Sequence, residues 1–497
     1  MKDVHTWNRS TQSVKALVWD ADAKKVVKTV SVNFGRELPE YGCPDGFLPN
    51  ADPLVRRADP LMWLAALDKV LAKLRDAFDT SAIAAIGGDG QQHGSVYLNE
   101  TWRDALGKLT ACGGSAEASS GEGTLVDIFC GVLARKEAPI WMDSSTSAEV
   151  AELAAKFGDG LRRRTGSPAI ERFTGPQIMK FAKENPSGWS ATRRVHLVSS
   201  FLCSVLSGTD APIDTGDGAG MNLLNLESLD WDDEICEAVA PGLGARLPAV
   251  SRPSAEVRRQ PASDSRQPVL RLARYFEKYG LRAGIPVVPF TGDNPASLVG
   301  TGADKPGVAV VSLGTSDTFF AAMKEFRTDP DGCGHVFGNP SGGFMSLACF
   351  KNGSLAREKV RSMVGCDYRF FDEGAFDEVR STNRRSPAAN RRLRAFPFFE
   401  SEITPLHAAT GIEADFDWEN ASAAEKVVSV VRGQVLNMYE RTRWIGSFDT
   451  IRVTGGASRS KGIRDTIADV FGAKVETLDV PDSAALGGAL LAARAVS

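Results

Sequence analysis

Hydrophobic and polar positions follow two periods along the chain, one typical of strands and one typical of helices. Near the start, KALVWD and KKVVKTVSV predict two strands. Residues 63–78 predict a helix, and SAIAAIGGDG predicts a short buried strand that ends in a glycine-rich turn. Because strands alternate with helices, we expect an α/β fold, which places its chemistry at the ends of strands. The apolar stripe of the predicted helix consists of Trp63, Leu67, Val70, Leu71, Leu74 and Phe78.

The pattern starts again after Gly284. A strand (PVVPF), a turn (TGDNPAS) and a strand (GVAVVSLGTSDTFFAA) come first, and a polar region follows. A long helix (AEKVVSVVRGQVLNMYERTRW), a strand (TIRVTGG), a helix and a last strand complete the second half. Each half also begins with a small residue followed by Thr at a hairpin, in STQS at 10–13 and in GTSDT at 314–318. This repetition predicts two related hairpins that grip phosphate.

Composition narrows the class of protein. The 497 residues are 43% hydrophobic and 24% charged, which excludes a wholly disordered chain. A net charge of −4 gives no electrostatic footprint for nucleic acid. Without a long apolar run or an apolar signal region, we expect a cytosolic protein with no membrane partner. The eight cysteines form no CxxC pair and only five histidines are present, which favours reduced, mostly buried thiols over a zinc site.

Three polar segments are predicted to be loops: Gly113–Gly123, Ser251–Gln267 and Asn383–Arg394. The second lies shortly before the strand PVVPF, near a domain boundary. The third carries five arginines. In an acidic protein, an isolated basic loop is more often solvated than bound to an anionic partner.

Four short segments carry the candidate chemistry. A P-loop and a dinucleotide-binding glycine motif are both absent from the sequence, so a nucleotide must be held another way. IGGDGQQHGS offers Gln and His side chains suited to a polyhydroxylated ligand, and FTGDNPASLVG puts an Asp and an Asn at the mouth of a strand. VVSLGTSDTFF and IRVTGGASRS are buried strands that open into small residues, whose backbone N–H groups can approach phosphates.

The ordered series of motifs resembles the FGGY family of carbohydrate kinases over nearly the whole chain. The series contains STQSVK, GQQHGS, PIWMDSST, ERFTG, HLVSSF, PID with GMNLL, FTGDNPASL, VSLGTSDT, CFKNGSL, SEITP, VTGGAS and PDSAALGGA. The resemblance implies an α/β fold of two actin-like, ribonuclease-H-like ATPase domains with an active-site cleft between them. We expect a sugar-binding domain over residues 1–290 and a nucleotide-binding domain over 291–497.

The resemblance also implies a reaction, the ATP-dependent phosphorylation of D-xylulose at its O5 hydroxyl. Asp293 matches the family's general base, a role that suits a carboxylate within reach of a primary hydroxyl. Taken alone, Asp293 would be a turn or helix-cap residue. His93, Arg172 and Asn294 match sugar-binding positions, and their hydrogen bonds would reject sugars of the wrong configuration. Gln92 and Asp143 are further candidates for the same pocket.

On the nucleotide side, the resemblance assigns Thr11 to the first phosphate hairpin and Gly314, Thr315 and Ser316 to the second. Gly455 and Gly456 match the adenosine motif, although tight strand-to-helix packing also requires glycine. Mg²⁺ should bridge the β- and γ-phosphates, held mostly through water with Asp293 and Asn8 nearest to it.

Two positions depart from the family pattern. Asn8 stands where the first phosphate motif has an aspartate, so a negative charge near Mg²⁺ is lost. His5 and Thr6 make a poor buried strand, which leaves open an altered start of the chain or an adapted site. Ser460 stands where many relatives carry Asn beside the base.

Alternative functions stay open on the sequence. One alternative is a kinase for another ketopentose or polyol, such as ribulose or ribitol. Another is a pseudokinase, weakened by Asn8, that binds sugar or nucleotide. An actin-like chaperone ATPase would leave GQQHGS and ERFTG without a purpose. The expected partners are the sugar and ATP, without nucleic acid, in a monomer or homodimer.

Overall fold

The computed structural model describes residues 3–9, 11–111, 123–252, 270–385, 393–480 and 482–496. The chain forms two compact units. Unit 1 comprises Met1–Gly302, Phe337–Phe344 and Asp482–Ser497, and unit 2 comprises Ala303–Val336 and Met345–Pro481. The units therefore differ from the predicted ranges. Unit 1 continues past residue 290 to residue 302, and it also includes the C-terminal helix.

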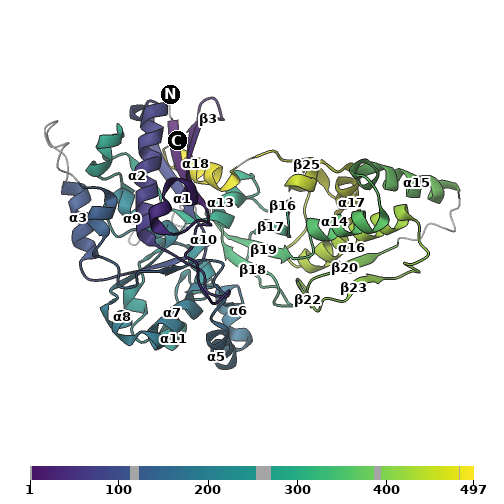
Figure 1. Ribbon diagram of the computed structural model, residues 1–497, viewed down its shortest axis with the longest axis horizontal. Helices are drawn as coiled ribbons and strands as arrows, with labels where there is room; N and C mark the ends of the chain where they lie inside the picture. Colours follow the sequence, from purple (N-terminus) through teal and green to yellow (C-terminus); the bar gives the residue numbers. More distant parts are fainter. Residues whose placement is uncertain are drawn as a thin grey trace. The chain divides into compact units, whose positions relative to one another are not determined.

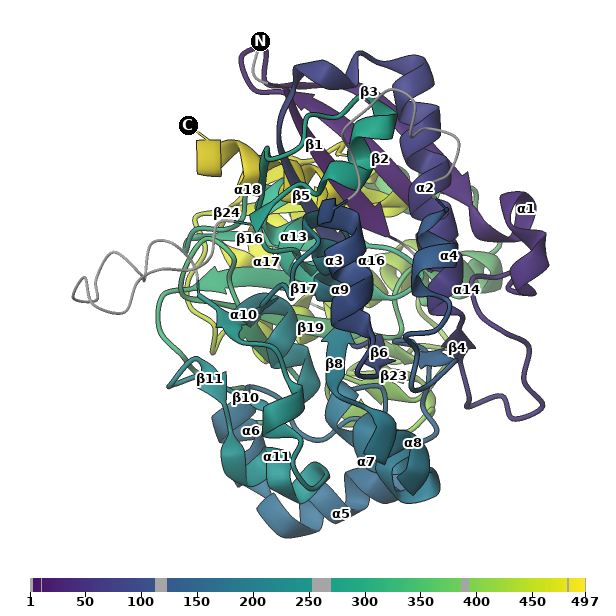
Figure 2. The same ribbon diagram turned by 90° about the vertical axis from the view of Figure 1, so that its left-hand side faces the viewer.

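Unit 1 is built around a mixed sheet with the strand order β13-β14-β5-β1-β2-β3 (Figures 1 and 2). Neighbours β1 and β2 are antiparallel, as are β2 and β3, whereas β1 and β5 are parallel. A short strand, β15, continues alongside the end of β5, with Gly292 opposite Gly90. The strands are β1 (Asp3–Arg9), β2 (Ser13–Asp20), β3 (Lys25–Asn33), β5 (Ile83–Gly90), β13 (Leu270–Arg271), β14 (Pro286–Val287) and β15 (Thr291–Gly292).

The N-terminal segment forms strand β1, although the residue types at His5 and Thr6 predict a poor buried strand. The register with β2 pairs Asp3 with Asp20 at one end and Arg9 with Val14 at the other. β1 also lies parallel to β5, so its backbone is paired on both sides. The two neighbouring strands supply the hydrogen bonds that outweigh the weak strand propensity of this segment.

Helices cover this sheet because their apolar stripes need burial. Helix α2 (Pro60–Ala77) starts at the N-cap Asp59, whose side chain accepts from the N–H of Leu61, and it buries all but the last of the predicted stripe residues. Phe78 follows the helix and is half-buried. The C-terminal helix α18 (Ser483–Val496) packs on β1, β2 and β5, beside the N-terminal strand (Figure 1).

Helix α18 also packs closely against helix α13 (Asp293–Gly300). A Cβ atom at Gly300 would lie 1.8 Å from the carbonyl oxygen of Ser483, and one at Gly487 would lie 1.9 Å from that of Ala296. Only glycine permits this approach. The last residues of the chain thus fix the helix that carries Asp293.

The rest of unit 1 is a helical region with small two-stranded sheets. In one of these sheets β6 (Ser95–Leu98) pairs antiparallel with β8 (Arg194–Leu197). The main helices are α3 (Trp102–Ala111), α4 (Leu125–Phe129), α5 (Ser147–Phe157), α6 (Asp159–Thr165), α7 (Thr174–Glu184), α8 (Pro186–Ala191), α9 (Val198–Ser207), α10 (Thr215–Gly218) and α11 (Asp233–Val239). Helix α9 is buried along its whole length.

Unit 2 has its own mixed sheet, with the strand order β18-β19-β17-β16-β24-β25. The pair β16–β17 is antiparallel, and β16, β24 and β25 run parallel. The strands are β16 (Val308–Leu313), β17 (Asp317–Met323), β18 (His335–Gly338), β19 (Phe344–Phe350), β24 (Thr450–Thr454) and β25 (Lys474–Thr477). Its helices are α14 (Ser354–Val364), α15 (Ala375–Arg385), α16 (Ala423–Thr442) and α17 (Lys461–Phe471).

Two local predictions in the second half need correction. TGDNPAS is not a turn: Thr291–Gly292 form β15, and α13 begins at Asp293, where Pro295 sits in the first helical turn and its missing N–H costs no hydrogen bond. The polar region after β17 contains strands β18 and β19 and helix α14, which the periodicity analysis did not identify.

The remaining predictions concern the three polar loops, the cysteines and membrane-spanning helices. Most of the three predicted loops lies outside the described residues. The seven described cysteines are free thiols, as expected, but only Cys43, Cys203 and Cys236 are buried. Within the described part of the chain, the structure contains no helix that is long and apolar enough to cross a membrane.

Candidate active site

In unit 1, the carboxyl ends of β1, β5 and β15 meet at one edge of the sheet. Trp7 of β1 lies opposite Gly88 of β5, and Gly292 of β15 lies opposite Gly90. The turns that follow these strands therefore come together, as expected for parallel neighbours. They carry Thr11, the segment 91–93, and the pair Asp293 and Asn294.

Asp293 is the centre of a hydrogen-bonded group that we call the Asp293 cluster, consisting of Gln92, Asp293 and Asn294. Oδ1 of Asp293 accepts from the backbone N–H of Asn294 at 2.9 Å and from its side-chain Nδ2 at 3.2 Å. The backbone N–H of Gln92 lies 3.4 Å from the same oxygen. These donors orient the carboxylate, which is half-buried at the first residue of α13.

Gln92 holds Asn294 in place. Its Oε1 accepts from Nδ2 of Asn294 at 2.9 Å, and its Nε2 lies 3.4 Å from the carbonyl oxygen of Gly216. The Gln92 side chain is buried, and both ends of its amide contact the chain itself. Its observed role is to position Asn294, while direct contact of Gln92 with a sugar stays a prediction.

His93 and Arg172 meet at Phe173, and we call these three residues the Phe173 stack. The His93 imidazole lies parallel to the Phe173 ring, with centroids 4.3 Å apart and an angle of 20° between the planes. The guanidinium carbon of Arg172 is 5.7 Å from the centroid of the same ring. The structure therefore brings these two predicted sugar-binding residues together.

The tautomer of His93 follows from its partner. Nδ1 lies 2.8 Å from the carbonyl oxygen of Gly220. Because a carbonyl oxygen only accepts, Nδ1 carries a hydrogen, and in the neutral imidazole Nε2 is an acceptor. His93 also has a φ of +69°, which is unusual for a residue other than glycine.

Two buried carboxyl groups lie beneath the Asp293 cluster. Asp217 accepts from the hydroxyl of Ser199, and a Cβ atom on Gly292 would lie 3.0 Å from its Oδ1. Burial, together with the charges of Asp214 and Asp293, raises the pKa of Asp217 well above its usual range. Burial also raises the pKa of Asp214 to about 6, although the N–H groups of Gly216 and Asp217 donate to it.

Asp143 and Thr11 are each engaged by their own chain. The carboxylate of Asp143 is fully buried and accepts from the N–H of Arg56, the N–H and hydroxyl of Ser145, and Nε2 of Gln177. These bonds tie loops together, so the structure gives Asp143 a supporting role. The hydroxyl of Thr11 accepts from Nε1 of Trp141 at 2.8 Å.

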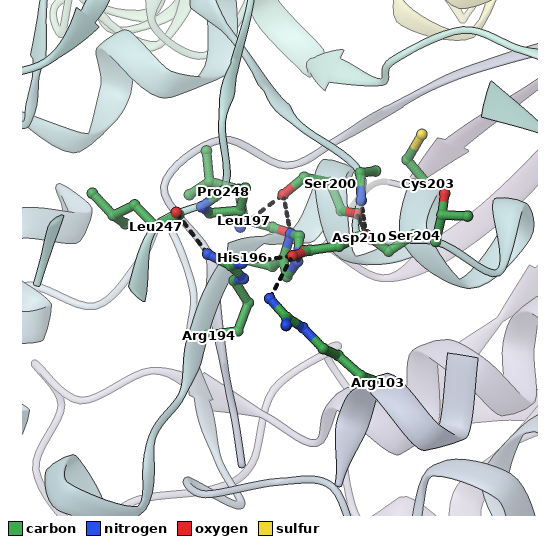
Figure 3. A network of polar contacts seen from close by, with 12 residues as sticks. Arg103, Arg194, His196, Leu197, Ser200, Cys203, Ser204, Asp210, Leu247 and Pro248 are labelled. Carbon is green, nitrogen blue, oxygen red and sulfur yellow. Dashed lines mark hydrogen bonds and ion pairs between the residues drawn. The ribbon is translucent and has the colours of Figure 1, made fainter. Parts of the chain in front are cut away.

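A buried polar network supports the strand beside the site (Figure 3). His196 of β8 contacts Oγ of Ser200 through Nδ1 at 2.9 Å and Oδ1 of Asp210 through Nε2 at 3.0 Å. Arg194 donates to Oδ2 of Asp210 at 2.6 Å. Burial lowers the pKa of His196, although Asp210 opposes this shift. The network fixes β8 to α9, the helix that carries Ser199.

In unit 2, the corresponding edge is formed by backbone and small residues, which we call the glycine edge: Gly314–Ser316 and Gly455–Gly456. Ser312 of β16 lies opposite Thr454 of the parallel strand β24, so the two turns are neighbours. Thr315, Ser316, Gly455 and Gly456 are exposed. The glycine edge offers backbone N–H groups and the hydroxyls of Thr315 and Ser316, whereas the edge in unit 1 carries the hydrogen-bonded Asp293 cluster.

Gly455 is required by its geometry. Its φ is +91°, and a Cβ atom there would lie 2.4 Å from the carbonyl oxygen of Leu313. Ser460, in contrast, is buried at the N-cap of α17. Its Oγ accepts from the N–H of Ile463 and donates to the carbonyl of Asp372, each at 3.3 Å. A contact between Ser460 and a nucleotide stays a prediction.

An ion pair secures the hairpin of the glycine edge from below. Arg357 of α14 contacts both carboxylate oxygens of Asp317, at 2.7 and 2.8 Å, and both residues are buried. Burial raises the pKa of Asp317 although Arg357 opposes the shift. The sequence analysis did not identify this pair, because the two residues are far apart in the chain.

The remaining observations concern Asn8, possible metal ligands and the residues that support the site. The backbone of Asn8 lies in β1 opposite Lys15, whereas its side chain lies outside the description. The described residues contain no group of three or more His, Cys, Asp or Glu side chains that could hold a metal ion. Phe173, Ser199 and Asp217 are supporting residues that sequence reasoning missed, although ERFTG, HLVSSF and the segment after PID marked their neighbourhoods.

The fold has close structural relatives. The xylulose kinase of Rhodospirillum rubrum superposes with a TM-score of 0.76 at 18% identity, covering 100% of this chain and 90% of that one. The gluconate kinase of Lactobacillus acidophilus gives 0.74 at 18% identity, covering 100% and 89%. At this identity the likeness concerns the fold alone, which is the two-domain, actin-like α/β fold of sugar kinases.

Sequence comparison then identifies the family. The profile of the C-terminal domain of the FGGY family of carbohydrate kinases matches residues 309–496, and that of the N-terminal domain matches residues 135–300. Xylulose kinase of Rattus norvegicus is 38% identical over 496 residues, covering 97% of this chain and 86% of the relative. Xylulose kinase 2 of Arabidopsis thaliana is 34% identical over 511 residues, covering 98% and 86%. The chain belongs to the FGGY family of carbohydrate kinases.

Proposed function

We propose that this sugar kinase transfers the γ-phosphoryl group of ATP to the O5 hydroxyl of D-xylulose, giving D-xylulose 5-phosphate in pentose metabolism. The observation that carries the proposal is the oriented carboxylate of Asp293, which Gln92 and Asn294 hold in unit 1. The mammalian, plant and fungal relatives, which match 97–98% of the chain, are named xylulose kinases. Neither observation favours a kinase for ribulose or ribitol.

Asp293 is the proposed general base. The reaction needs the proton of the attacking hydroxyl to be removed as the oxygen bonds to phosphorus, and a positioned carboxylate contributes roughly 10²–10⁴-fold to such a step. The donors on Oδ1 fix the direction in which the carboxylate faces. Asn294 orients this carboxylate through Nδ2, which also donates to Gln92, so its Oδ1 is the atom proposed to accept from the sugar.

His93, Arg172 and Asn294 are the proposed sugar-binding residues. Since Nδ1 of His93 is committed to Gly220, the neutral ring accepts a hydrogen bond from a sugar hydroxyl through Nε2. The Arg172 guanidinium only donates. A pocket with fixed acceptors on His93 and Asn294 and fixed donors on Arg172 distinguishes sugar configurations, because a wrong hydroxyl leaves a polar group without its partner.

The glycine edge of unit 2 is the proposed site of ATP. Gly314, Thr315 and Ser316 present their backbone N–H groups to phosphate, and Gly455 and Gly456 leave space for the adenosine. A Cβ atom on Gly456 would meet no atom within 4 Å, which supports an open surface there. Thr11 would contact phosphate from the first hairpin.

Mg²⁺ is the proposed metal. The residues present fit an ion that keeps most of its waters, since a half-buried carboxylate is available at Asp293 and no cage of three acidic, His or Cys side chains occurs in the described residues. Asp293 and Asn8 are the residues proposed to lie nearest to the ion. When bound to ATP, Mg²⁺ neutralises charge on the β- and γ-phosphates. We further expect a cytosolic monomer or homodimer without nucleic-acid or membrane partners.

The test is a coupled ADP-release assay with Mg²⁺ and ATP over D-xylulose, D-ribulose, L-ribulose, ribitol, gluconate and glycerol. A no-sugar reaction measures ATP hydrolysis, and the Asp293→Asn variant is the matched control for dependence on the base. We expect clear preference for D-xylulose. Faster turnover of ribulose or ribitol would replace the substrate, and silence over the panel with D-xylulose still bound would indicate a pseudokinase.

A further inference from the structure

Phe173 contacts two of the proposed sugar-binding side chains, His93 and Arg172. Its ring is fully buried at the N-cap of α7. The His93 imidazole stacks on it at 4.3 Å, and Arg172, its neighbour in the chain, places its guanidinium carbon 5.7 Å from the centroid. Aromatic stacking and a cation over a ring face both favour defined geometries.

The backbone of His93 needs such support. Its φ of +69° is costly for a residue with a side chain, and such a conformation persists only where the surroundings enforce it. The carbonyl of Gly220 accepts from Nδ1, and the hydroxyl of Thr174 donates to the His93 carbonyl at 3.0 Å. These two hydrogen bonds hold Nδ1 and the carbonyl oxygen of His93, and the Phe173 ring fixes the plane of the imidazole.

Gly220 confines the same ring from another direction. A Cβ atom on Gly220 would lie 2.9 Å from both Cε1 and Nδ1 of His93. The imidazole therefore occupies a slot that Phe173 and Gly220 define. Thr174, which holds the His93 carbonyl, directly follows Phe173, so one short segment carries Arg172, the stacking ring and the backbone anchor.

We propose that Phe173 is a positioning residue for sugar recognition, which aligns His93 and Arg172 so that they bind the sugar as one unit. This inference rests on the proposed function, since it assumes that both side chains contact the sugar. Phe173 itself is buried and acts only through its two neighbours.

The first test compares the full-length Phe173→Leu and Phe129→Leu variants. Phe129 is also fully buried in unit 1, in edge-to-face contact with Phe201, so its substitution removes a similar apolar volume away from the stack. For Phe173→Leu we expect the KM for D-xylulose to rise about three- to tenfold, the worth of one or two aromatic contacts. The KM for ATP should stay unchanged, and Phe129→Leu should change neither constant.

A double-mutant cycle separates positioning from general loosening. If Phe173 acts through His93, Phe173→Leu should raise the KM for D-xylulose less in a His93→Ala background than in the wild type. Full additivity of the two effects would overturn the proposal. If His93→Ala leaves sugar binding unchanged, the proposed sugar site itself is wrong, which is a distinguishable result.

A spectroscopic measurement does not depend on activity. Only five histidines occur, so imidazole Cε1–H signals can be followed in a ¹³C-histidine-labelled protein and His93 assigned with His93→Asn. Loss of the stacked ring should shift the His93 signal and leave buried His196 unmoved. Should Phe173→Leu not fold, Phe173→Met, whose longer unbranched side chain adapts better to an irregular space, replaces it. An unmoved His93 signal or an unchanged sugar KM in the folded variant would refute the role.

Discussion

The sheets of units 1 and 2 share a strand arrangement, although the two units differ in the ligand that we propose for each. In each, an antiparallel hairpin is followed in the sheet by a parallel strand: β2-β1-β5 in unit 1 and β17-β16-β24 in unit 2. A further parallel neighbour extends each series, β14 in unit 1 and β25 in unit 2. The same topology therefore brings one hairpin turn and one following turn to the same edge in both units.

The edges differ in what they offer. In unit 1, the edge is filled by side chains that bond to one another, centred on Asp293. In unit 2, it is exposed and nearly bare, with glycine at 314, 455 and 456. A sugar needs directional side-chain partners for each hydroxyl, whereas phosphates are well served by backbone N–H groups. Under the proposed function, one strand arrangement supports two kinds of recognition, and the side chains at the ends of its strands make the difference.

The strongest way to break the comparison is to remove the base from unit 1. Asp293→Ala should lower kcat by about 10²–10⁴-fold, because the attacking hydroxyl loses its proton acceptor. D-Xylulose should still bind, as measured by calorimetry, since other residues hold the sugar. Turnover equal to that of the wild type in the ADP-release assay would remove the assignment.

Substitution of the sugar-binding side chains should affect only one ligand. Arg172→Ala should raise the KM for D-xylulose about ten- to 100-fold, because hydrogen bonds from a charged donor are lost. The KM for ATP should not move. His93→Ala should act in the same direction with a smaller effect. If the ATP constant moved instead, the division of ligands between the units would be wrong.

The glycine edge allows the reciprocal test. Gly455→Ala should cost about 1–3 kcal/mol of stability and raise the KM for ATP, because φ is +91° and a Cβ atom would meet the Leu313 carbonyl. The matched control for the effect on stability is Gly456→Ala, where a Cβ atom meets no protein atom within 4 Å. Thermal unfolding measures the stability of both variants, and ATP titration measures the KM of Gly455→Ala. Equal loss of stability in the two variants would contradict the geometry.

The smallest expected effect comes from a substitution at the first hairpin. Asn8→Asp restores a negative charge near the proposed ion, so Mg²⁺ affinity or activity should rise about two- to fivefold if Asn8 is a loss. A magnesium titration of the initial rate measures it. A flat or lower response would show that the site has adapted to the amide.

The sequence predicts the alternation of strands and helices. It also predicts the two hairpins at 10–13 and 314–318 and carries the ordered series of motifs. Periodicity is local, so α2, β2, β3, β5 and α16 follow from it. Local reasoning failed at β1, where paired neighbours outweigh weak propensity, and at α13, where the first helical turn accepts proline. The motifs also marked Asp293, Asn294, His93 and Arg172 before their geometry was known.

Tertiary structure alone decided how these residues cooperate. Three contacts depend on segments distant in the chain: the N–H of Gln92 on Oδ1 of Asp293, Nδ1 of His93 on the carbonyl of Gly220, and the Phe173 ring on the His93 imidazole. The position of α18 in unit 1 likewise depends on contacts between segments distant in the chain. Residue types and spacing determine which chemistry is available, whereas hydrogen-bond direction and ring stacking depend on packing between elements, which a linear pattern does not contain.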